Sequence, residues 1–320
     1  MTSRIIGIGS YLPENIVTNT DLTEFIDTSD EWIRERSGIC ARRISTEEGT
    51  SALAVKAAKR AIEDAGIAPE EIEIIVLATS SPDRAFPSAA TDVQAAVGAL
   101  NAVDFDITAA CSGFIYGMHI VQGFIKSGIY KTGLVIGAET LGKVLYWTDR
   151  GTCFLFGDGA GAAVVRADER GLIDTLVGSD GRKGWVLDCQ ARSLGNCLTK
   201  TKPELGFMQM DGQEVFKFAV RKVPEITKKI MEDNGVSQED IRYFVLHQAN
   251  YRILEAVSRR LNIPMEKIPV NLDQYGNTSA ASIPVLLDEM HRDGRLERGD
   301  RIVLSGFGAG LTWGAMLLEW

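Results

Sequence analysis

Apolar positions along this chain recur with two different periods, and stretches of the two kinds alternate. The segments 51–65, 114–125 and 212–234 place apolar side chains every three to four residues, which is typical of helices with one buried face. The segments 133–138 and 302–307 are short, apolar and glycine-containing, which is typical of buried strands. Since such strands and helices alternate throughout, the pattern predicts an α/β fold.

The pattern is repeated within the chain at an offset of 169 residues. The segments 63–77 and 232–246 both predict a helix end, a glycine C-cap, an acidic helix start and a buried strand. Identical residues occur at Glu63/Glu232, Asp64/Asp233, Gly66/Gly235, Glu70/Glu239, Ile72/Ile241, Val76/Val245 and Leu77/Leu246. Because similarity at a constant offset indicates a repeated structural unit, we expect two similar halves, 1–170 and 171–320, joined near residues 168–180.

The same offset extends to the ends of the predicted strands. The strand-like segment 103–106 falls opposite 272–275, and Cys111 falls opposite Ala280 at the start of the following helix. Since corresponding strand ends of two packed halves can meet, we expect these loops to converge on one site. The least regular stretch, 179–206, is rich in Gly, Lys, Arg and Asn and predicts a surface loop or cap.

Composition limits the classes of protein that fit this chain. Its 320 residues allow one large or two ordinary domains, and its net charge of −9 argues against nonspecific nucleic-acid binding. No apolar run approaches ~18 residues, and the N-terminus reads as a strand rather than a signal peptide, so we expect no membrane span and a cytoplasmic location. The odd number and scattered spacing of the cysteines argue against a disulfide framework or a zinc site. They are Cys40, Cys111, Cys153, Cys189 and Cys197.

Cys111 stands where a strand-like segment gives way to a helix-like one. Small residues crowd the turn on both sides of it, at 109–110 and 112–113. A thiol at a helix N-terminus faces free backbone N–H groups, which favour the thiolate and lower the thiol pKa. Such a sulfur suits nucleophilic attack on an acyl group. The alternative is a small buried cysteine that serves only packing.

Two further polar residues follow strand ends in the second half. His247 ends the apolar run 243–246, and Asn277 lies in the loop equivalent to that of Cys111. Taken singly, each is more often structural, the histidine in the core and the asparagine in a turn or cap. At paired positions of a doubled fold, their combination with Cys111 favours a catalytic site. Papain-like hydrolases also use Cys, His and Asn, but their Cys-Gly-Ser-Cys-Trp signature is absent.

The glycine-rich run 157–161 invites comparison with dinucleotide-binding loops. Phosphate binding by such loops needs a helix directly after the glycines. Here the apolar strand 162–165 follows instead. The run therefore argues against a nicotinamide cofactor, and we expect neither a cofactor nor a metal ion.

Several motifs occur together, in order, along nearly the whole chain. They are Asp30–Ile39, Ala85–Ala90, Thr108–Gly113, Asp149–Gly151, Phe156–Gly161, Leu246–Asn250, Gly276–Ser279 and Gly306–Gly314. In this combination the chain closely resembles the β-ketoacyl-acyl-carrier-protein synthase III family, the condensing acyltransferases that initiate bacterial fatty-acid synthesis. The resemblance implies a thiolase-like fold, with two pseudo-symmetric halves of mixed sheets and helices in layers.

The resemblance also implies a mechanism. The family's Cys-His-Asn triad maps onto Cys111, His247 and Asn277, whereas elongating relatives use two histidines. The remaining histidines, His119 and His291, lie inside a helix and in a polar run, so we expect both to be structural or solvated. A short acyl-CoA would acylate the cysteine. Decarboxylative Claisen condensation with malonyl-acyl carrier protein would then give 3-ketoacyl-acyl carrier protein, CoA and CO2.

Binding positions follow from the same resemblance. Backbone N–H groups of Cys111 and Ala309 would form the oxyanion hole, although the family often has glycine at the second position. Phe86 and Pro87 match a segment that crosses a homodimer, where the phenylalanine limits the partner's acyl pocket. The positions expected to contact CoA are Thr28, Trp32, Arg36, Arg150 and Asn250. Indole and guanidinium groups suit a flat adenine and its phosphates.

Positive charge is expected near the entrance of the site, because carrier proteins are strongly acidic in families of this kind. The expected docking residues are Lys217, Arg221, Lys222, Arg252, Arg259 and Arg260. The alternative is that these side chains form ordinary solvated helix faces.

Two other functions stay open from the sequence. One is a related ketosynthase that primes a secondary-metabolite pathway, polyketide or quinolone-like, which an acyl-CoA panel would separate. The other is a non-catalytic acyl-CoA-binding homologue, which the complete triad disfavours. The choice among acetyl, longer straight-chain and branched primers depends on pocket residues in several loops. The segment 182–206, which contains Cys189 and Cys197, departs most from the family pattern.

Overall fold

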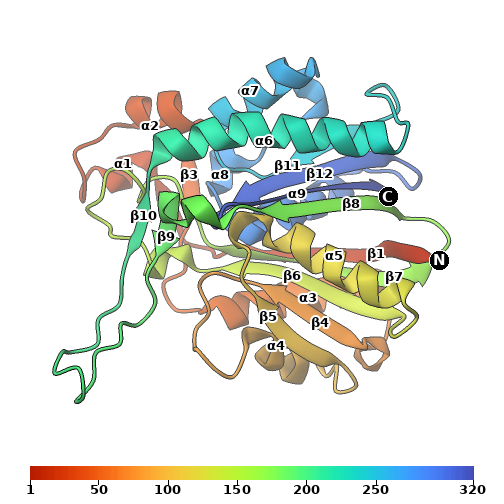
Figure 1. Ribbon diagram of the computed structural model, residues 1–320, viewed down its shortest axis with the longest axis horizontal. Helices are drawn as coiled ribbons and strands as arrows, with labels where there is room; N and C mark the ends of the chain where they lie inside the picture. The colour runs from red at the N-terminus through yellow and green to blue at the C-terminus, as the bar shows by residue number, and fades with distance from the viewer.

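The computed structural model describes residues 1–320 and contains two β-sheets, with helices between them and on both outer faces (Figure 1). The first sheet has the order β1-β7-β6-β4-β5 and the second the order β8-β13-β12-β11. The first comprises β1 (Thr2–Tyr11), β7 (Gly159–Asp168), β6 (Thr132–Glu139), β4 (Ile74–Ala78) and β5 (Val103–Ile107). The second comprises β8 (Leu172–Ser179), β13 (Thr312–Glu319), β12 (Arg301–Gly308) and β11 (Tyr243–Leu246). The predicted α/β class is confirmed.

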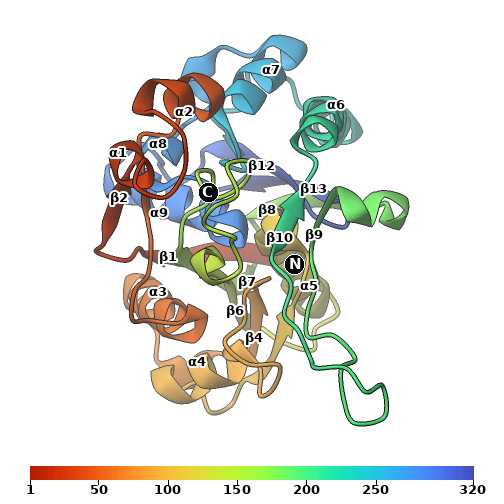
Figure 2. The same ribbon diagram turned by 90° about the vertical axis from the view of Figure 1, so that its left-hand side faces the viewer.

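The long helices occupy three layers (Figure 2). Two lie between the sheets: α5 (Gly113–Lys126) and α9 (Ser282–Arg292). Two cover the outer face of the first sheet: α3 (Thr50–Ala65) and α4 (Ala89–Val97). Two cover the outer face of the second: α6 (Gly212–Asp233) and α7 (Tyr251–Leu261). The helices predicted at 51–65, 114–125 and 212–234 are confirmed to within one or two residues.

The duplication is visible in the backbone. Gly66 and Gly235 follow α3 and α6 at equivalent positions, with φ of 63° and 61°, a conformation that glycine adopts without a Cβ penalty. Strands β6 and β12 have the same length and lie 169 residues apart. The first sheet is built from residues 2–168 and the second from residues 172–319. The division into units 1–170 and 171–320 stays a prediction.

One part of the expected repeat is wrong. Residues 272–275, the counterpart of strand β5, form the short helix α8 (Leu272–Tyr275), so the second sheet ends at β11. The carbonyl of Asp273 instead accepts a hydrogen bond from the Cys40 N–H at 2.8 Å, next to β3 (Ala41–Arg43). One carbonyl of this segment is thus satisfied next to the β2–β3 hairpin, where β2 is Ile16–Thr18, and the other backbone bonds of the segment lie within its own turn.

Residues 179–206, expected as a surface loop or cap, belong to a projecting arm (Figure 2). Its base is a two-stranded sheet of β9 (Leu187–Cys189) and β10 (Met208–Met210), preceded by η4 (Gly181–Val186). The projecting part is exposed, as expected. The base is not, because Val186 is fully buried and Leu187 lines the cavities described below.

The remaining helical turns are short. They are α1 (Asn19–Leu22), α2 (Asp30–Ser37), η1 (Pro69–Glu71), η2 (Ala110–Ser112), η3 (Leu141–Lys143), η5 (Met265–Lys267) and η6 (Ser279–Ala281). None of the helices in the structure combines the length and the apolar character needed to cross a bilayer. The turns that matter for function are η2 and η6, which begin the two central helices and contact each other.

Candidate active site

Cys111 lies in η2, directly before α5 and after β5, as its sequence context predicts. The preceding residue, Ala110, has a φ of 45°, which is uncommon for a residue with a side chain. Gly308 at the end of β12 packs against this turn so closely that a Cβ there would lie 2.7 Å from the Cys111 nitrogen. The second half therefore holds the cysteine turn in place by direct backbone contact.

Cys111, His247 and Asn277 line one cavity of about 210 Å³. All three are buried, with 7%, 3% and 7% of their surface exposed. Apolar rings, including Phe156 and Phe307, form much of the remaining wall. The convergence expected from the duplication is present, since one residue comes from the first half and two from the second.

His247 follows β11, and its backbone N–H donates to the Ser305 carbonyl of β12 at 2.9 Å. Its Nδ1 lies 2.7 Å from the Ser282 hydroxyl, which also accepts from the Gln248 N–H at 3.4 Å. The hydroxyl proton is therefore available to Nδ1, which places the ring proton on Nε2. Nε2 is buried without a partner in the protein. Burial lowers the pKa of His247 to about 3, so the ring is neutral near pH 7.

Asn277 is held by hydrogen bonds on three sides. Its backbone N–H donates to the Leu155 carbonyl at 2.8 Å, and its own carbonyl accepts from the Gly157 N–H at 3.1 Å. Its side-chain Oδ1 accepts from the Ser279 N–H at 2.8 Å. Because the amide oxygen is occupied by a backbone donor, the Nδ2 group remains as a hydrogen-bond donor. Asn277 and His247 thus each present an N–H to the cavity that contains the thiol.

The backbone N–H of Cys111 lowers the thiol pKa, as expected at a helix N-terminus, but the expected net lowering is wrong. Burial raises the pKa of the thiol to about 12, and the nearby carboxylate of Glu139 adds to the increase. Side-chain hydrogen bonds with Ser279 and Asn277 act in the opposite direction but do not outweigh burial. The position of Cys111 at a helix N-terminus is visible in the sequence. The desolvation of the thiol and the carboxylate of Glu139 on another strand, which both raise its pKa, are not. The resting cysteine is therefore a protonated thiol.

A second cavity, of about 330 Å³, also opens on Cys111. Its walls are mainly apolar, with Leu141, Val144 and Met208 among them. Ala309 lines this cavity beside the cysteine. Cys111 thus stands at the junction of two cavities, one with polar donors and one with an apolar lining.

The residues expected to contact CoA lie close together near the first cavity. The Arg150 guanidinium lies 4.4 Å from the centre of the Trp32 ring, and that of Arg36 lies 5.7 Å from it. Asn250 lines the cavity and donates through Nδ2 to the Arg36 carbonyl at 3.0 Å. The Thr28 hydroxyl oxygen is buried and has no partner. The structure brings this group together, and its role stays a prediction.

The expected docking residues separate into two kinds. Lys217 and Lys222 are engaged in ion pairs at 2.9 and 2.7 Å with acidic residues of their own helix, α6. Arg221, Arg252, Arg259 and Arg260 are exposed and form no ion pair. Of these, Arg252 lies in the first turn of α7, directly after the cavity residue Asn250, whereas the last two lie at the opposite end of that helix.

Phe86 and Pro87 lie in the loop between β4 and α4, away from both cavities of this chain. Phe86 is 85% exposed, which is unusual for a large apolar side chain. His119 and His291 also lie outside the two cavities; the latter faces Asp64 at 3.3 Å.

Sequence reasoning missed Glu139, Ser279 and Ser282. The first two bear on the thiol, and the third contacts the imidazole. The 169-residue offset contained a signal for Ser279, because this residue falls opposite Ala110, and both have a positive φ (50° and 45°). No sequence pattern pointed to Glu139.

Comparisons with known proteins agree with this site. Residues 105–181 match the family model 3-oxoacyl-[acyl-carrier-protein (ACP)] synthase III, and residues 231–320 match the model of its C-terminal part. The chain is 53% identical to β-ketoacyl-[acyl-carrier-protein] synthase III of Clostridium acetobutylicum over 99% of this chain and 98% of the relative.

Solved structures give the same result. A crystal structure of 3-oxoacyl-[acyl-carrier-protein] synthase III from Aquifex aeolicus superposes with a TM-score of 0.93 at 47% identity, covering 99% of this chain and 100% of that one. The priming β-ketosynthase of the R1128 polyketide pathway superposes with a TM-score of 0.91 at 35% identity, covering 99% and 96%. The fold is that of a thiolase-fold condensing acyltransferase. The chain belongs to the β-ketoacyl-acyl-carrier-protein synthase III family, which initiates fatty-acid synthesis.

Proposed function

We propose that Cys111 accepts a short acyl group from acyl-CoA and passes it to the carbanion formed when malonyl-acyl carrier protein loses CO2. The products are 3-ketoacyl-acyl carrier protein, CoA and CO2. One observation carries this proposal: Cys111, His247 and Asn277 lie buried together at the junction of two cavities. The 330 Å³ cavity suits the acyl chain, and the 210 Å³ cavity, which carries the His247 and Asn277 donors in a mainly apolar wall, suits the thioester carbonyl and the phosphopantetheine arm.

In the first stage the sulfur of Cys111 attacks the thioester carbonyl. The tetrahedral intermediate carries an oxyanion, which backbone N–H groups of Cys111 and Ala309 stabilise. CoA thiolate leaves, and the acyl group remains on the cysteine with its chain in the apolar cavity.

In the second stage the malonyl group enters the cavity that His247 and Asn277 line and loses CO2. The enolate oxygen that forms accepts hydrogen bonds from Nε2–H of His247 and from Nδ2–H of Asn277. Both donors are neutral near pH 7, so they persist across the working range of pH. Removing one donor of this kind typically slows the step by ~10²–10³-fold.

The group around Trp32 is the proposed site for the CoA nucleotide. The Arg150 guanidinium stacks directly on the indole at 4.4 Å, so it would move aside or stack on the far side of the base when a flat adenine binds against Trp32. Arg36 is placed to bind a phosphate, and the unpartnered hydroxyl of Thr28 offers a hydrogen bond to the base. Asn250 stands between this group and the triad.

Carrier-protein docking is proposed at the entrance between the first turns of α6 and α7. Arg252 is the strongest candidate, because it is exposed, unpaired and next to the cavity. Arg221, Arg259 and Arg260 extend the positive surface, whereas Lys217 and Lys222 would first have to exchange their intrahelical partners.

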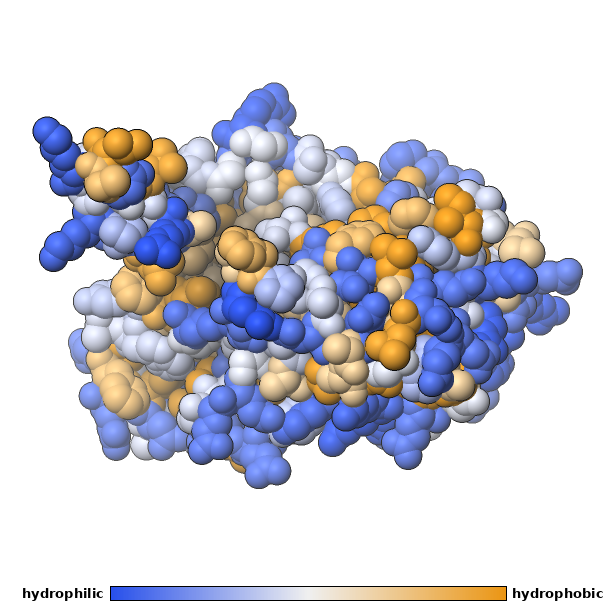
Figure 3. Space-filling view, turned by 90° about the horizontal axis from the view of Figure 1, so that it is seen from below, coloured by the Kyte–Doolittle hydropathy of each residue, from blue (hydrophilic) through white to orange (hydrophobic).

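A homodimer is proposed on three observations. Strand β5 forms an edge of the first sheet and offers unpaired backbone groups to a second copy. Phe86 is exposed and lies on the loop beyond the same sheet. Figure 3 shows apolar side chains on the projecting arm, where Leu194, Leu198 and Leu205 are exposed. A partner would cover these side chains and bring its own Phe86 to the acyl cavity. We further propose a cytoplasmic location and no cofactor besides the substrates.

Incubation with radiolabelled acyl-CoAs of different chain length, followed by malonyl-acyl carrier protein, tests the proposal. Label should attach to Cys111, and ketoacyl product should appear only after the second addition. A Cys111→Ala variant that still forms acyl-enzyme would overturn the assignment. The higher identity to the fatty-acid enzymes than to the polyketide-priming relative favours fatty-acid synthesis, and short primers should therefore react fastest.

A further inference from the structure

Glu139, at the end of β6, is a fully buried carboxylate without a cationic partner. It accepts hydrogen bonds from the Ser80 N–H at 3.1 Å and from the hydroxyls of Thr79 at 3.2 Å, Ser81 and Ser279 at 3.0 Å. Burial of a carboxylate without a counter-ion is costly and is more frequent at functional sites than elsewhere.

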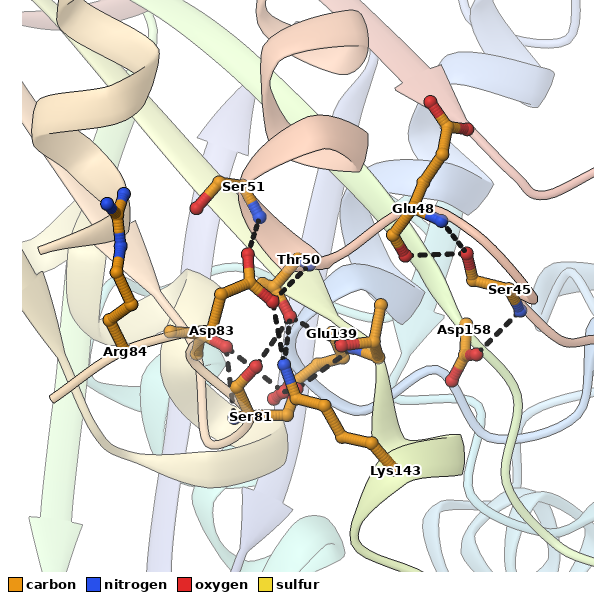
Figure 4. Close-up of polar contacts among 12 residues, drawn as sticks. Ser45, Glu48, Thr50, Ser51, Ser81, Asp83, Arg84, Glu139, Lys143 and Asp158 are labelled. Atoms are coloured by element: carbon orange, nitrogen blue, oxygen red, sulfur yellow. Dashed lines mark hydrogen bonds and ion pairs between the residues drawn. The ribbon is translucent and has the colours of Figure 1, made fainter.

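The hydroxyls around Glu139 have little choice of proton position. Ser81 Oγ accepts from the Thr140 N–H at 2.9 Å, and Thr79 Oγ1 accepts from the Ser81 N–H at 3.1 Å. Each hydroxyl therefore points its own proton at Glu139, and Figure 4 shows Ser81 and Glu139 in contact. Burial raises the pKa of Glu139, and the four donors act in the opposite direction by favouring its anionic form. A raised pKa makes the carboxylate a stronger proton acceptor.

Ser279 connects this carboxylate to the nucleophile. It lines the apolar cavity together with Cys111, and its turn η6 contacts the cysteine turn η2. The Ser279 hydroxyl has one proton and two partners, Glu139 at 3.0 Å and the Cys111 sulfur. While the cysteine is a thiol and the serine proton lies toward Glu139, an oxygen lone pair can accept the S–H proton. The charge of Glu139 acts on Cys111, whose pKa it raises. The charged pair of Lys143 and Asp83 lies beyond Thr50 (Figure 4).

We propose that Glu139 takes the thiol proton of Cys111 through the hydroxyl of Ser279 during acyl transfer and returns it during condensation. In the first stage the S–H bond breaks, a C–S bond to the acyl carbon forms, and CoA leaves as its thiolate. The thiol proton moves to Ser279 Oγ as the serine proton moves to Glu139. In the second stage the new C–C bond expels the Cys111 thiolate, and the same two protons move back. This proton relay from Cys111 through Ser279 to Glu139 rests on the proposed function and deepens it.

An internal acceptor is needed because the acyl donor itself closes the site. A bound acyl-CoA would fill the cavity that carries His247 and Asn277 with its pantetheine arm and the second cavity with its acyl chain, and so exclude water from the thiol. His247 is a poor acceptor, because Nδ1 is taken by Ser282 and Nε2 carries the ring proton. Ser279 lines the second cavity at Cys111 and not the one that His247 and Asn277 line, and Glu139 lies behind it at 3.0 Å.

Two rates measured on Glu139→Gln separate the relay from other roles. Alkylation of Cys111 by iodoacetamide, followed as a function of pH, reports the thiolate in an open cavity from which the proton can reach water. Single-turnover acyl transfer from acetyl-CoA reports the closed site. Because a like charge is removed, alkylation at pH 8 should become about tenfold faster, corresponding to a shift of about one pKa unit. Acyl transfer should become at least tenfold slower, by loss of the acceptor.

Opposite changes are the signature of a relay. A purely electrostatic role predicts that both rates rise, and a purely structural role that both fall; either result would overturn the proposal. Ser279→Ala also removes a hydrogen bond that lowers the thiol pKa, so it should slow alkylation, and it should slow acyl transfer by at least a further tenfold. Glu139→Asp should recover part of the acyl transfer that Glu139→Gln loses. Asp288→Asn, which removes another buried carboxylate, should change neither rate by more than about twofold. A wild-type protein that alkylates normally but accepts no acyl group from any acyl-CoA would instead overturn the proposed function.

Discussion

The turns that begin α5 and α9 share a backbone and differ in chemistry. Ala110 and Ser279 occupy equivalent positions and have φ of 45° and 50°. One residue later, the first turn presents Cys111 to both cavities. The second turn has Ala280 at that point, 1% exposed and lining neither cavity. The same local geometry therefore produces a nucleophile in one half and a packing contact in the other.

The strand end opposite each turn differs in the same way. Gly308 ends β12 and packs on the cysteine turn, whereas Glu139, its equivalent in β6, hydrogen-bonds to Ser279 in the second turn. A glycine leaves room for the thiol and its substrate, and a glutamate fills the corresponding space with charge. The two halves therefore share the same backbone at these turns, and their different side chains make one turn the site of the nucleophile and the other a packing and hydrogen-bonding contact.

Moving the nucleophile from one turn to the other would break the comparison most directly. The double variant Cys111→Ala, Ala280→Cys has a thiol at the equivalent backbone position but outside both cavities. Acyl transfer should fall by at least ~10³-fold, as expected when a nucleophile is removed. Acyl-enzyme formation, measured by mass spectrometry of the intact protein, checks this. Acylation of the relocated thiol in the second turn would show that the two turns are functionally interchangeable.

Asn277 tests the supporting side of the comparison. The Asn277→Ala variant should retain acyl transfer from acyl-CoA and lose ~10²–10³-fold in decarboxylation of malonyl-acyl carrier protein, because one enolate donor is gone. Release of labelled CO2 and formation of acyl-enzyme are measured separately. Equal loss in both steps would contradict the assignment.

Gly308→Ala tests the contact between β12 and the cysteine turn. The new Cβ would lie 2.7 Å from the Cys111 nitrogen, so the turn must move. We expect a loss of ~1–3 kcal/mol in the free energy of unfolding and slower acyl transfer. Denaturant unfolding and single-turnover kinetics provide the measurements. Gly123→Ala in α5, where a Cβ meets nothing within 4 Å, is the matched control and should retain both.

His247 predicts a difference in acid stability. Its pKa is lowered by burial to about 3, so between pH 3 and 6.5 the unfolded chain binds a proton that the folded chain does not. This group therefore opposes folding increasingly as pH falls through that window, with a slope of up to about 1.4 kcal/mol per pH unit. The difference in free energy of unfolding between wild type and His247→Gln, measured from pH 7 to pH 4, should move in favour of the variant as pH falls. A constant difference would show that the imidazole is not buried.

The smallest effect is expected at the entrance. Arg252→Glu should raise the KM for malonyl-acyl carrier protein several-fold at low salt, and less at high salt, because an exposed charge contributes mainly to steering. Its effect on acyl transfer from acyl-CoA should be slight if only docking is altered. Lys228→Glu, on α6 and outside the cavity lining, is the control. Equal effects of both changes would indicate net charge rather than a docking surface.

Much of the fold was accessible from the sequence. The periodicity predicted α3, α5 and α6 closely, and the 169-residue offset predicted that loops of two halves would meet. The helical conformation of residues 272–275 could not be predicted, because a short segment forms a strand only where a neighbouring strand edge is available. Here the segment forms its own turn, and one of its carbonyls bonds to the Cys40 N–H beside the β2–β3 hairpin. The base of the arm could not be predicted for a similar reason, because composition indicates irregularity but not that Leu187 turns inward.

The sequence by itself determined the periods of the elements, the doubling, and the identity of the three polar residues at strand ends. Only the tertiary structure decided the protonation state of Cys111 and His247. A pKa depends on desolvation and on charges that arrive from distant strands, and neither is encoded in local order along the chain. Cys111 lies at the start of a helix, as the sequence predicted, yet burial and Glu139 raise its pKa and keep the thiol protonated. The burial arises because Gly308 of the second half packs on the turn that contains Cys111.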